Sequence, residues 1–335
     1  MGIDLPLIWA VIILFGIMMY VFMDGFDLGI GLLYPLFPDK IERDVMMNTV
    51  APVWDGNETW LVLGGAGLLA AFPLAYAVIL SALYIPLTLM LIGLIFRGVA
   101  FEFRFKARDH ERHWWDKAFF LGSLTATFFQ GVALGAYVQG IPVVARSYAG
   151  GTFDWISPFS LFTGLGLVAG YALLGSSWLI MKTEGRLQLH ASLLTSRLLW
   201  VLLLFIAGIS LWTPLIDVQI GDRWLSLPGL LLFAPVPLLV VLTAWIMLRA
   251  LRQGRQHAPF VCTLALFFLA YSGLGISLWP NIVPLSITIA EASAPPQSQG
   301  FALVGALLII PVILMYTVWS YYVFRGKVSQ HEAYH

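Results

Sequence analysis

Residues 6–36 read PLIWAVIILFGIMMYVFMDGFDLGIGLLYPL, an apolar stretch longer than the roughly 20 residues that a membrane-crossing helix needs. Two aspartates interrupt it, Asp24 and Asp27, and their spacing of three residues puts them on one face of a helix. An ionisable group in the hydrocarbon core costs about 3 kcal/mol or more, so such a residue is a functional candidate by default. This stretch therefore predicts a membrane helix that carries a polar functional site.

The whole chain has the composition of an integral membrane protein. Its 335 residues are 60% hydrophobic and 11% charged, whereas about a quarter of the residues of a soluble domain are charged. The 18 Lys and Arg balance the 18 Asp and Glu, which argues against nucleic acid as a partner, and one cysteine cannot form an internal disulfide. No basic segment precedes the first apolar stretch, so we expect that stretch to stay in the mature protein rather than to be cleaved as a signal peptide.

Polar breaks divide the chain into nine predicted spans within a single integral membrane domain, residues 1–335. The spans are 6–36, 50–71, 74–103, 117–141, 157–181, 190–213, 228–249, 259–285 and 299–324. Cytoplasmic loops are rich in lysine and arginine, which decides the orientation. Fourteen of the 18 lie in alternate connections, Arg146 and Arg223 lie in the opposite ones, and Arg97 and Arg197 lie within spans. We expect an all-α polytopic membrane protein with its N-terminus outside and its C-terminus in the cytoplasm.

Two further motifs place charged residues in the cytoplasmic half of the predicted bundle. The second span opens with WDGNETW at 54–60, in which Asp55 and Glu58 are again three residues apart, and the third ends with RGVAFEFR at 97–104, which begins with Arg97. Together with the two aspartates of the first span, four carboxylates face one buried cation. This surplus of acid predicts either shared protons or a cation from a partner.

Most of these charges also have a purely structural explanation. Asp55 is placed to interact with the positive end of a helix dipole, and Glu102 is spaced to pair with Lys106 one turn further on. Arg104 suits a cytoplasmic anchor. Arg97 is either the counter-ion of the acids or a functional group in its own right.

The histidines argue against a haem held by this chain. Membrane haem proteins usually bind iron through histidines inside their helices. All six histidines here fall in or beside predicted cytoplasmic connections or the tail: His110, His113, His190, His257, His331 and His335. His110 and His113 are better explained as part of a solvated basic loop than as metal ligands, so we assign no metal site.

The polar motifs carry a resemblance to a known family. The segments MDGFDLG at 23–29, APVWDGNETWLV at 51–62 and FRGVAFEFR at 96–104 resemble subunit II of the cytochrome bd-type ubiquinol oxidases. The similarity extends over essentially the whole chain, including the nine predicted helices and the outside N-terminus. The compact length and Glu58 are closer to the cyanide-insensitive branch of the family than to its longer subunits.

The resemblance implies a multi-pass protein of the bacterial inner membrane that belongs to a respiratory oxidoreductase. In this family subunit I holds two b-type haems and one d-type haem, and ubiquinol is the substrate on the outer side. Oxygen is reduced to water with protons drawn from the cytoplasm. Subunit II pairs with subunit I as a heterodimer, and the resemblance leaves room for a small accessory subunit, membrane lipid, and a quinone or lipid bound in this chain.

The resemblance also implies roles for individual residues. The proton path that the family places along the subunit boundary maps onto four carboxylates, Asp24 and Asp55, with Asp27 and Glu58 as companions. Trp54 and Arg97 match positions expected near subunit I, close to a haem.

Two other classes of function remain open at this point. In a secondary transporter, intramembrane carboxylates would bind ions or substrate, but such proteins commonly contain inverted repeats, and none is evident here. A purely structural chaperone for a haem subunit would need no acid chemistry. Co-purification with a haem-rich partner separates the oxidase from the transporter, and loss of turnover with haem retained separates it from the chaperone.

The predicted topology can be tested with reporter fusions. Fusions after Gly150 and after Gln297 should report an extracytoplasmic position, and fusions after Arg108 and after Gln253 a cytoplasmic one, because these sites fall in alternate connections. A reversed signal at any one site would remove a span from the predicted nine.

Overall fold

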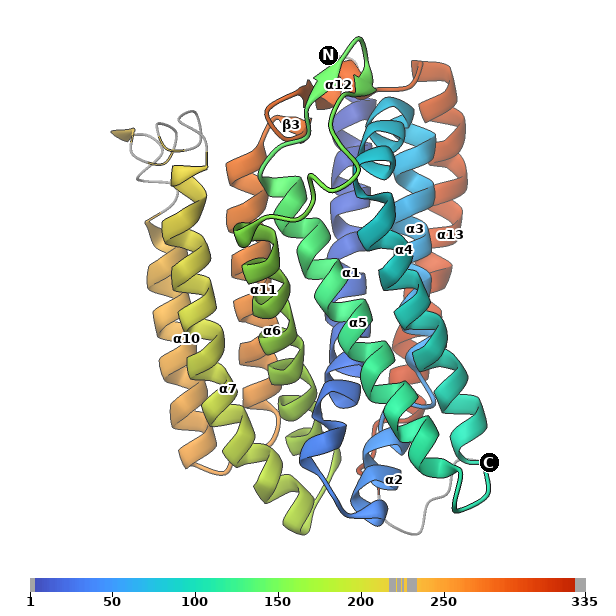
Figure 1. The fold of residues 1–335 in the computed structure, drawn as a ribbon, viewed down its shortest axis with the longest axis vertical. Helices are drawn as coiled ribbons and strands as arrows, with labels where there is room; N and C mark the ends of the chain where they lie inside the picture. The colour runs from blue at the N-terminus through green and yellow to red at the C-terminus, as the bar shows by residue number, and fades with distance from the viewer. Residues whose placement is uncertain (1–3, 217–220, 222–223, 225, 228–233, 329–335) are drawn as a thin grey trace.

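The computed structural model describes residues 4–216, 221, 224, 226–227 and 234–328, and within them the chain is almost entirely helical. These residues form a single bundle of long helices lying side by side (Figure 1). The helices of 18 residues or more are α1 (Leu5–Leu33), α3 (Trp54–Ala71), α4 (Pro73–Arg104), α5 (Arg112–Val138), α6 (Pro158–Lys182), α7 (Gly185–Trp212), α10 (Pro235–Arg252), α11 (Ala258–Leu278) and α13 (Pro296–Val323).

Eight helices in the described part of the chain are long and apolar enough to cross a membrane. The other long helix, α3, has 18 residues, but its first turns contain Asp55, Asn57 and Glu58, which lower its hydropathy. The structure thus confirms a polytopic all-helical membrane protein. The ninth span and the inside–outside orientation stay predictions.

Two predicted spans end differently in the structure. Span 6–36 stops being α-helical at Leu33 and closes with the 3-10 turn η1 (Tyr34–Leu36), which contains a proline. Span 259–285 is wrong over its last seven residues, because α11 ends at Leu278. The residue before a proline disfavours the helical conformation, and Trp279 precedes Pro280. For span 228–249, residues 228–233 lie outside the described residues.

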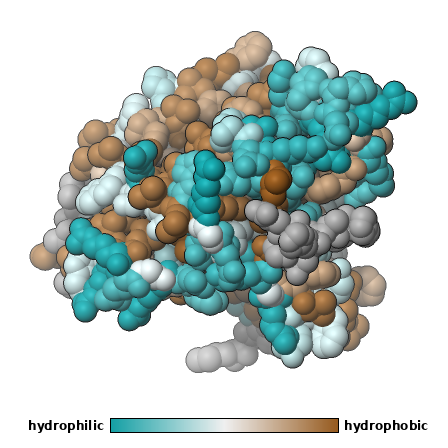
Figure 2. All heavy atoms as spheres, turned by 90° about the horizontal axis from the view of Figure 1, so that it is seen from below, coloured by the Kyte–Doolittle hydropathy of each residue, from teal (hydrophilic) through white to brown (hydrophobic). Residues whose placement is uncertain are grey.

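Short elements cover the two ends of the bundle. At one end lie the hairpin β1 (Val143–Val144) to β2 (Ser147–Tyr148), the hairpin β3 (Asn281–Val283) to β4 (Ile287–Thr288), and α12 (Ile289–Ala292). Both hairpins are antiparallel. At the opposite end the short helix α2 (Lys40–Asn48) follows η1 (Figure 1). Seen from that end, hydrophilic residues gather over much of the surface (Figure 2).

Helix α1 is the element around which the others are arranged. It contacts α3, α5, α6, α11 and α13, while α7 and α10 lie further from it, beyond α6 and α11 (Figure 1). The C-terminal part of α1 is buried without interruption from Asp24 to Leu33. After α13 the chain crosses the end of α6, where the Val328 amide donates to the Lys182 carbonyl oxygen at 2.9 Å. The first and last long helices are therefore both held against α6.

Helices α1 and α6 approach closely where both lack side chains. A Cβ added at Gly29 would lie 2.0 Å from the Tyr171 carbonyl oxygen, and one at Gly175 would lie 2.4 Å from the Gly29 carbonyl carbon. Gly25 and Gly29, four residues apart on α1, both face α6, and small residues at this spacing let two helix backbones approach closely.

We expect Gly29→Ala to destabilise the protein by about 1–3 kcal/mol, because the backbone of α6 must move to admit the methyl group. Thermal unfolding of the purified protein measures the loss. Gly275→Ala on α11 is the matched control, since a Cβ there meets nothing within 4 Å among the described residues. Equal melting temperatures for the two variants would contradict the close contact.

Candidate functional site

The acid face of α1 is buried completely. Asp24 and Asp27 each have an exposed fraction of 0%. They lie in the inner part of α1, where the neighbouring helices α3, α5 and α6 surround it. Burial of a carboxylate in such a place is costly unless it is paired and hydrogen bonded. The partners of these two aspartates therefore define the site.

Arg97 is the cation of the site. It is fully buried on α4, and its Nη1 lies 2.5 Å from Asp24 Oδ1. Its Nη2 donates to Glu58 Oε1 of α3, whose side chain is 29% exposed. One planar guanidinium thus links carboxylates of two other helices, which matches the fork geometry of arginine. The interpretation of Arg97 as a counter-ion of the acids is the one that this geometry supports.

Asp27 is joined to the site by an amide instead of a cation. Asn57 Nδ2 donates to Asp27 Oδ2 at 2.7 Å and also lies 3.2 Å from the Met23 carbonyl oxygen. The hydroxyl group of Tyr321, on α13, donates to Asn57 Oδ1 at 2.9 Å. The acid face of α1 is thereby connected to α3 and to the last long helix.

The two remaining predicted residues lie at the edge of the site. Trp54 stacks on Phe101 with ring centres 4.9 Å apart, and its ring centre lies 6.0 Å from the central carbon of the Arg97 guanidinium. Asp55 is exposed in the first turn of α3 and is not brought into contact with Arg97. Its position fits the helix-dipole interpretation, and it lies three residues before Glu58 on the same helix.

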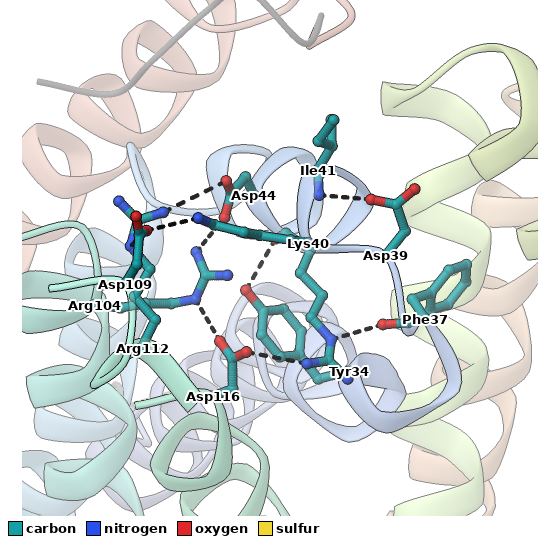
Figure 3. A network of polar contacts seen from close by, with 11 residues as sticks. Tyr34, Phe37, Asp39, Lys40, Ile41, Asp44, Arg104, Asp109, Arg112 and Asp116 are labelled. Atoms are coloured by element: carbon teal, nitrogen blue, oxygen red, sulfur yellow. Dashed lines mark hydrogen bonds and ion pairs between the residues drawn. The ribbon is translucent and has the colours of Figure 1, made fainter. Parts of the chain in front are cut away.

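A second buried arginine lies seven residues further along α4. Arg104 is 1% exposed, and it contacts Asp116 Oδ1 at 2.5 Å and Asp44 Oδ1 at 2.6 Å. The sequence suggested a cytoplasmic anchor for this residue, which stays a prediction, and the structure adds that α2 and α5 supply carboxylates that contact it (Figure 3). Asp116 also accepts a hydrogen bond from Arg43 at 3.0 Å. The network ties α2 to α4 and α5.

Exposed ion pairs surround this second network. Lys40 Nζ lies 2.7 Å from Asp109 Oδ1 (Figure 3), and this contact holds the pKa of the Asp109 carboxyl below its usual range. Glu102 pairs with Lys106 at 3.5 Å, which confirms the predicted pairing one turn apart. Exposed pairs of this kind contribute little to stability. The buried ion pairs of Arg104 fix the position of α2, and the exposed ion pairs around them contribute little to it.

The described histidines lie away from the acid site. His110 and His113 are exposed next to the start of α5, and His257 precedes α11. The His190 ring lies 4.5 Å from that of Phe37 near the start of α7. Within the described ranges no group of three or more His, Cys, Asp or Glu is placed to hold a metal ion. The residues around Arg97 do not include an axial histidine, so they do not fit a haem held by this chain; His331 and His335 lie outside the described residues.

Several residues of the site were not singled out from the sequence. Asn57 lies inside a motif that was already quoted, and a buried amide between two acids could have been suspected there. Tyr321 is 264 residues away from its partner Asn57. Asp44 and Asp116 lie in segments that read as ordinary charged connections. No spacing rule in the sequence points to any of these long-range partners.

A bundle of membrane-length helices with a buried arginine between carboxylates defines a polytopic membrane protein with an internal acid site. Comparison with known proteins then identifies its family. Residues 5–324 match the family model described as cytochrome bd terminal oxidase subunit II.

Individual relatives agree with this match. The chain is 31% identical over 341 residues to cytochrome bd ubiquinol oxidase subunit 2 of Bacillus subtilis (strain 168), covering 97% of each chain. It is 29% identical over 376 residues to cytochrome bd-I ubiquinol oxidase subunit 2 of Escherichia coli (strain K12), covering 98% of this chain and 96% of the relative. The fold resembles a chain of the bd oxidase from Geobacillus thermodenitrificans with a TM-score of 0.76 and 20% identity, over 96% of this chain and 98% of that chain.

The chain therefore belongs to the cytochrome bd terminal oxidase subunit II family, as its three motifs indicate. It is a subunit of a quinol oxidase, an oxidoreductase of the bacterial inner membrane, and a subunit I is its partner. The use of haem and quinol by the complex follows from the family.

Removing the buried cation should destabilise the subunit. We expect Arg97→Gln to lower the free energy of unfolding by about 3–5 kcal/mol, because it strands Asp24 and Glu58 without a counter-ion. Arg97→Lys should restore only part of the loss, since an ammonium group cannot bridge both carboxylates as a planar fork does. Thermal unfolding of the purified complex measures both effects.

The matched control for this series is Arg197→Gln, which removes an exposed arginine within α7. Adding Asp24→Asn to Arg97→Gln should recover stability, because the double variant removes both members of one pair. Equal stability of Arg97→Gln and Arg197→Gln would show that the guanidinium does not support the acids.

Proposed function

We propose that this chain pairs with a haem-bearing subunit I in a ubiquinol oxidase and that its acid site conducts protons inward from the cytoplasmic side. Ubiquinol is the substrate in the names of the relatives from Bacillus subtilis and Escherichia coli. The two b-type haems and the d-type haem belong to the partner in this proposal, because the residues around Arg97 offer no axial ligand. Electrons then bypass this chain, and its own contribution is to move protons.

The proposal rests on one observation: the exposed fraction of the carboxylates falls from Asp55 through Glu58 to Asp24. Asp55 is exposed, Glu58 is half-buried one turn further along α3, and Asp24 is fully buried on the other side of Arg97. A proton taken up at the Asp55 carboxylate reaches Glu58 along one helix face. From Glu58 it passes to Asp24, the other carboxylate that contacts Arg97, while the guanidinium keeps its own protons.

The charge balance of the site suits a relay of this kind. Three carboxylates, those of Asp24, Asp27 and Glu58, surround one guanidinium, and no other Lys or Arg of the described chain pairs with them. Excess negative charge in a poor solvent is lowered in energy by binding a proton. Coupled carboxylates share such protons as a unit, so a proton that arrives at one is redistributed among all three.

Proton uptake from the cytoplasmic side explains how the complex conserves energy. Quinol oxidation releases protons on the outer side, and reduction of oxygen to water consumes protons drawn through this site from the inner side. Charge is thereby separated across the membrane without a pump. Trp54, stacked beside the guanidinium, is then a positioning residue near subunit I.

The transporter alternative has no observation in its favour. An ion ligated by Asp24 and Glu58 would have to occupy the place that the Arg97 guanidinium already fills. Membership of the cyanide-insensitive branch, a small accessory subunit, and a quinone or lipid bound in this chain stay predictions of the resemblance.

The relay can be tested with Asp24→Asn in the purified complex. We expect ubiquinol-driven oxygen consumption to fall about 100-fold, because an amide cannot take up and release a proton. Asp24→Glu, which keeps an acid, should retain most of the activity. Haem absorption spectra should be unchanged in both variants, which separates the relay from a structural role in holding subunit I.

The control is Glu102→Gln, which removes an exposed carboxylate on α4 that pairs only with Lys106 in the described structure. It should turn over like the unmodified complex. Wild-type oxygen consumption by Asp24→Asn would sink the relay, and loss of haem from Asp24→Asn and Asp24→Glu alike would support a chaperone instead.

A further inference from the structure

Helix α5 carries a polar stripe that faces the protein interior. Ser123, Thr127 and Gln130 are spaced by four and three residues, which puts them on one face of the helix. Ser123 and Thr127 are fully buried. Within the described part of the chain, Ser123 Oγ, Thr127 Oγ1 and Gln130 Oε1 have no hydrogen-bond partner.

Other buried hydroxyl groups in this protein behave differently. A serine or threonine within a helix usually donates to a carbonyl oxygen one turn back. Thr263 does so at 2.9 Å to Pro259, Ser177 at 2.9 Å to Leu174, and Thr195 at 2.8 Å to Ala191. The stripe on α5 is therefore an exception that calls for a partner of another kind.

The stripe faces the acid face of α1. A Cβ added at Gly31 would lie 2.0 Å from Ser123 Oγ, so these two positions are in contact. Because α1 and α5 run in opposite directions, one turn along each helix brings Thr127 to the depth of Asp27. Another turn brings Gln130 to the depth of Asp24.

A hydrogen bond supports this register. Gln130 Nε2 donates to the Tyr171 hydroxyl group at 2.9 Å, and the Tyr171 ring lies 2.9 Å from a Cβ added at Gly25, next to Asp24. The α1 side also has an acceptor without a partner in the described residues. Asp27 Oδ1 is buried there without a hydrogen-bond partner, one turn from the hydrogen-bonded pair of Tyr20 and Asp24.

We propose that the interval between Ser123, Thr127 and Gln130 of α5 and the acid face of α1 binds a file of water molecules. Unpartnered oxygens line it from both helices, and a buried water satisfies two to four such groups at once. A lipid chain is excluded as the occupant because the lining consists of hydroxyl, amide and carboxyl oxygens. This polar lining separates the interval from an apolar cavity, which would stay dry.

The water file gives Asp24 and Asp27 a second hydrogen-bonded approach. Its inner end at Ser123 lies two turns of α5 beyond Asp116, the residue that joins α5 to the cytoplasmic network of Arg104. Protons that enter there reach the aspartates without passing Glu58. This role rests on the proposed function of the site, whereas the presence of the water does not.

Hydroxyl-radical footprinting of the intact complex tests for the water itself. Radicals generated by X-rays from bound water oxidise the side chains beside it, so Tyr20 and Tyr171 should be labelled although they are buried. Tyr34 is the control, because it is buried and its hydroxyl group donates to the Arg43 carbonyl oxygen at 2.9 Å. Labelling of Tyr20 and Tyr171 no greater than that of Tyr34 would overturn the proposal.

Two conservative substitutions test delivery of protons by the same water. Thr127→Val and Ser123→Ala keep the side-chain shape but remove the hydroxyl group, so labelling at Tyr171 should fall and oxygen consumption should slow roughly fivefold. The matched controls are Thr263→Val and Ser177→Ala, whose hydroxyl groups already bond to their own helices. Turnover of Thr127→Val equal to that of Thr263→Val would rule out delivery by this route.

The two proposals fail in different ways. Full activity of Asp24→Asn would remove the relay but leave the labelling of Tyr20 and Tyr171 unchanged. Background labelling of these tyrosines, with Asp24→Asn still inactive, would remove the water file and leave the relay.

Discussion

The guanidinium of Arg97, held between the carboxylates of Asp24 and Glu58, is the interaction on which this structure depends. It joins α1 to the consecutive helices α3 and α4, and the Arg97 and Asp24 side chains of the cluster are fully buried. A single charge buried in this way carries a large desolvation penalty, which only an oppositely charged partner offsets. The cluster therefore fixes how α1, α3 and α4 must lie relative to one another.

The same design occurs twice on α4. Arg97 and Arg104 are seven residues apart, both are buried, and each contacts carboxylates from two other segments. Arg97 joins α4 to the long helices α1 and α3, and Arg104 attaches the short helix α2 together with α5 (Figure 3). Helix α4 thus carries two buried cations that between them hold four carboxylates of the neighbouring segments.

The helices and the acid site were predictable from the sequence to different extents. Long apolar runs announce membrane helices because few other structures tolerate them, and Asp24, Asp27 and Arg97 stand out because charges are rare there. The boundary at Leu278 was missed because the apolar residues Ile282, Val283 and Leu285 extend the hydrophobic run past Pro280, which ends the helix. The pairing of Asn57 with Tyr321 and of Arg104 with Asp116 depends on which segments meet, and hydropathy carries no information on that. Asp55 and Glu58 looked alike in sequence, and only the fold separates the exposed carboxyl from the half-buried one.

The hydrogen bond from Tyr321 to Asn57 has a consequence for biogenesis. Tyr321 lies on α13, the last long helix to leave the ribosome, whereas Asn57 and Asp27 belong to the first helices to be inserted. The polar face between α1 and α3 therefore lacks one of its partners throughout synthesis and obtains it only when the final helix enters the membrane. Without α13 the amide nitrogen of Asn57 would keep its acceptors on α1, but its Oδ1 would lose the hydroxyl group that donates to it, so the polar face is completed only when α13 packs.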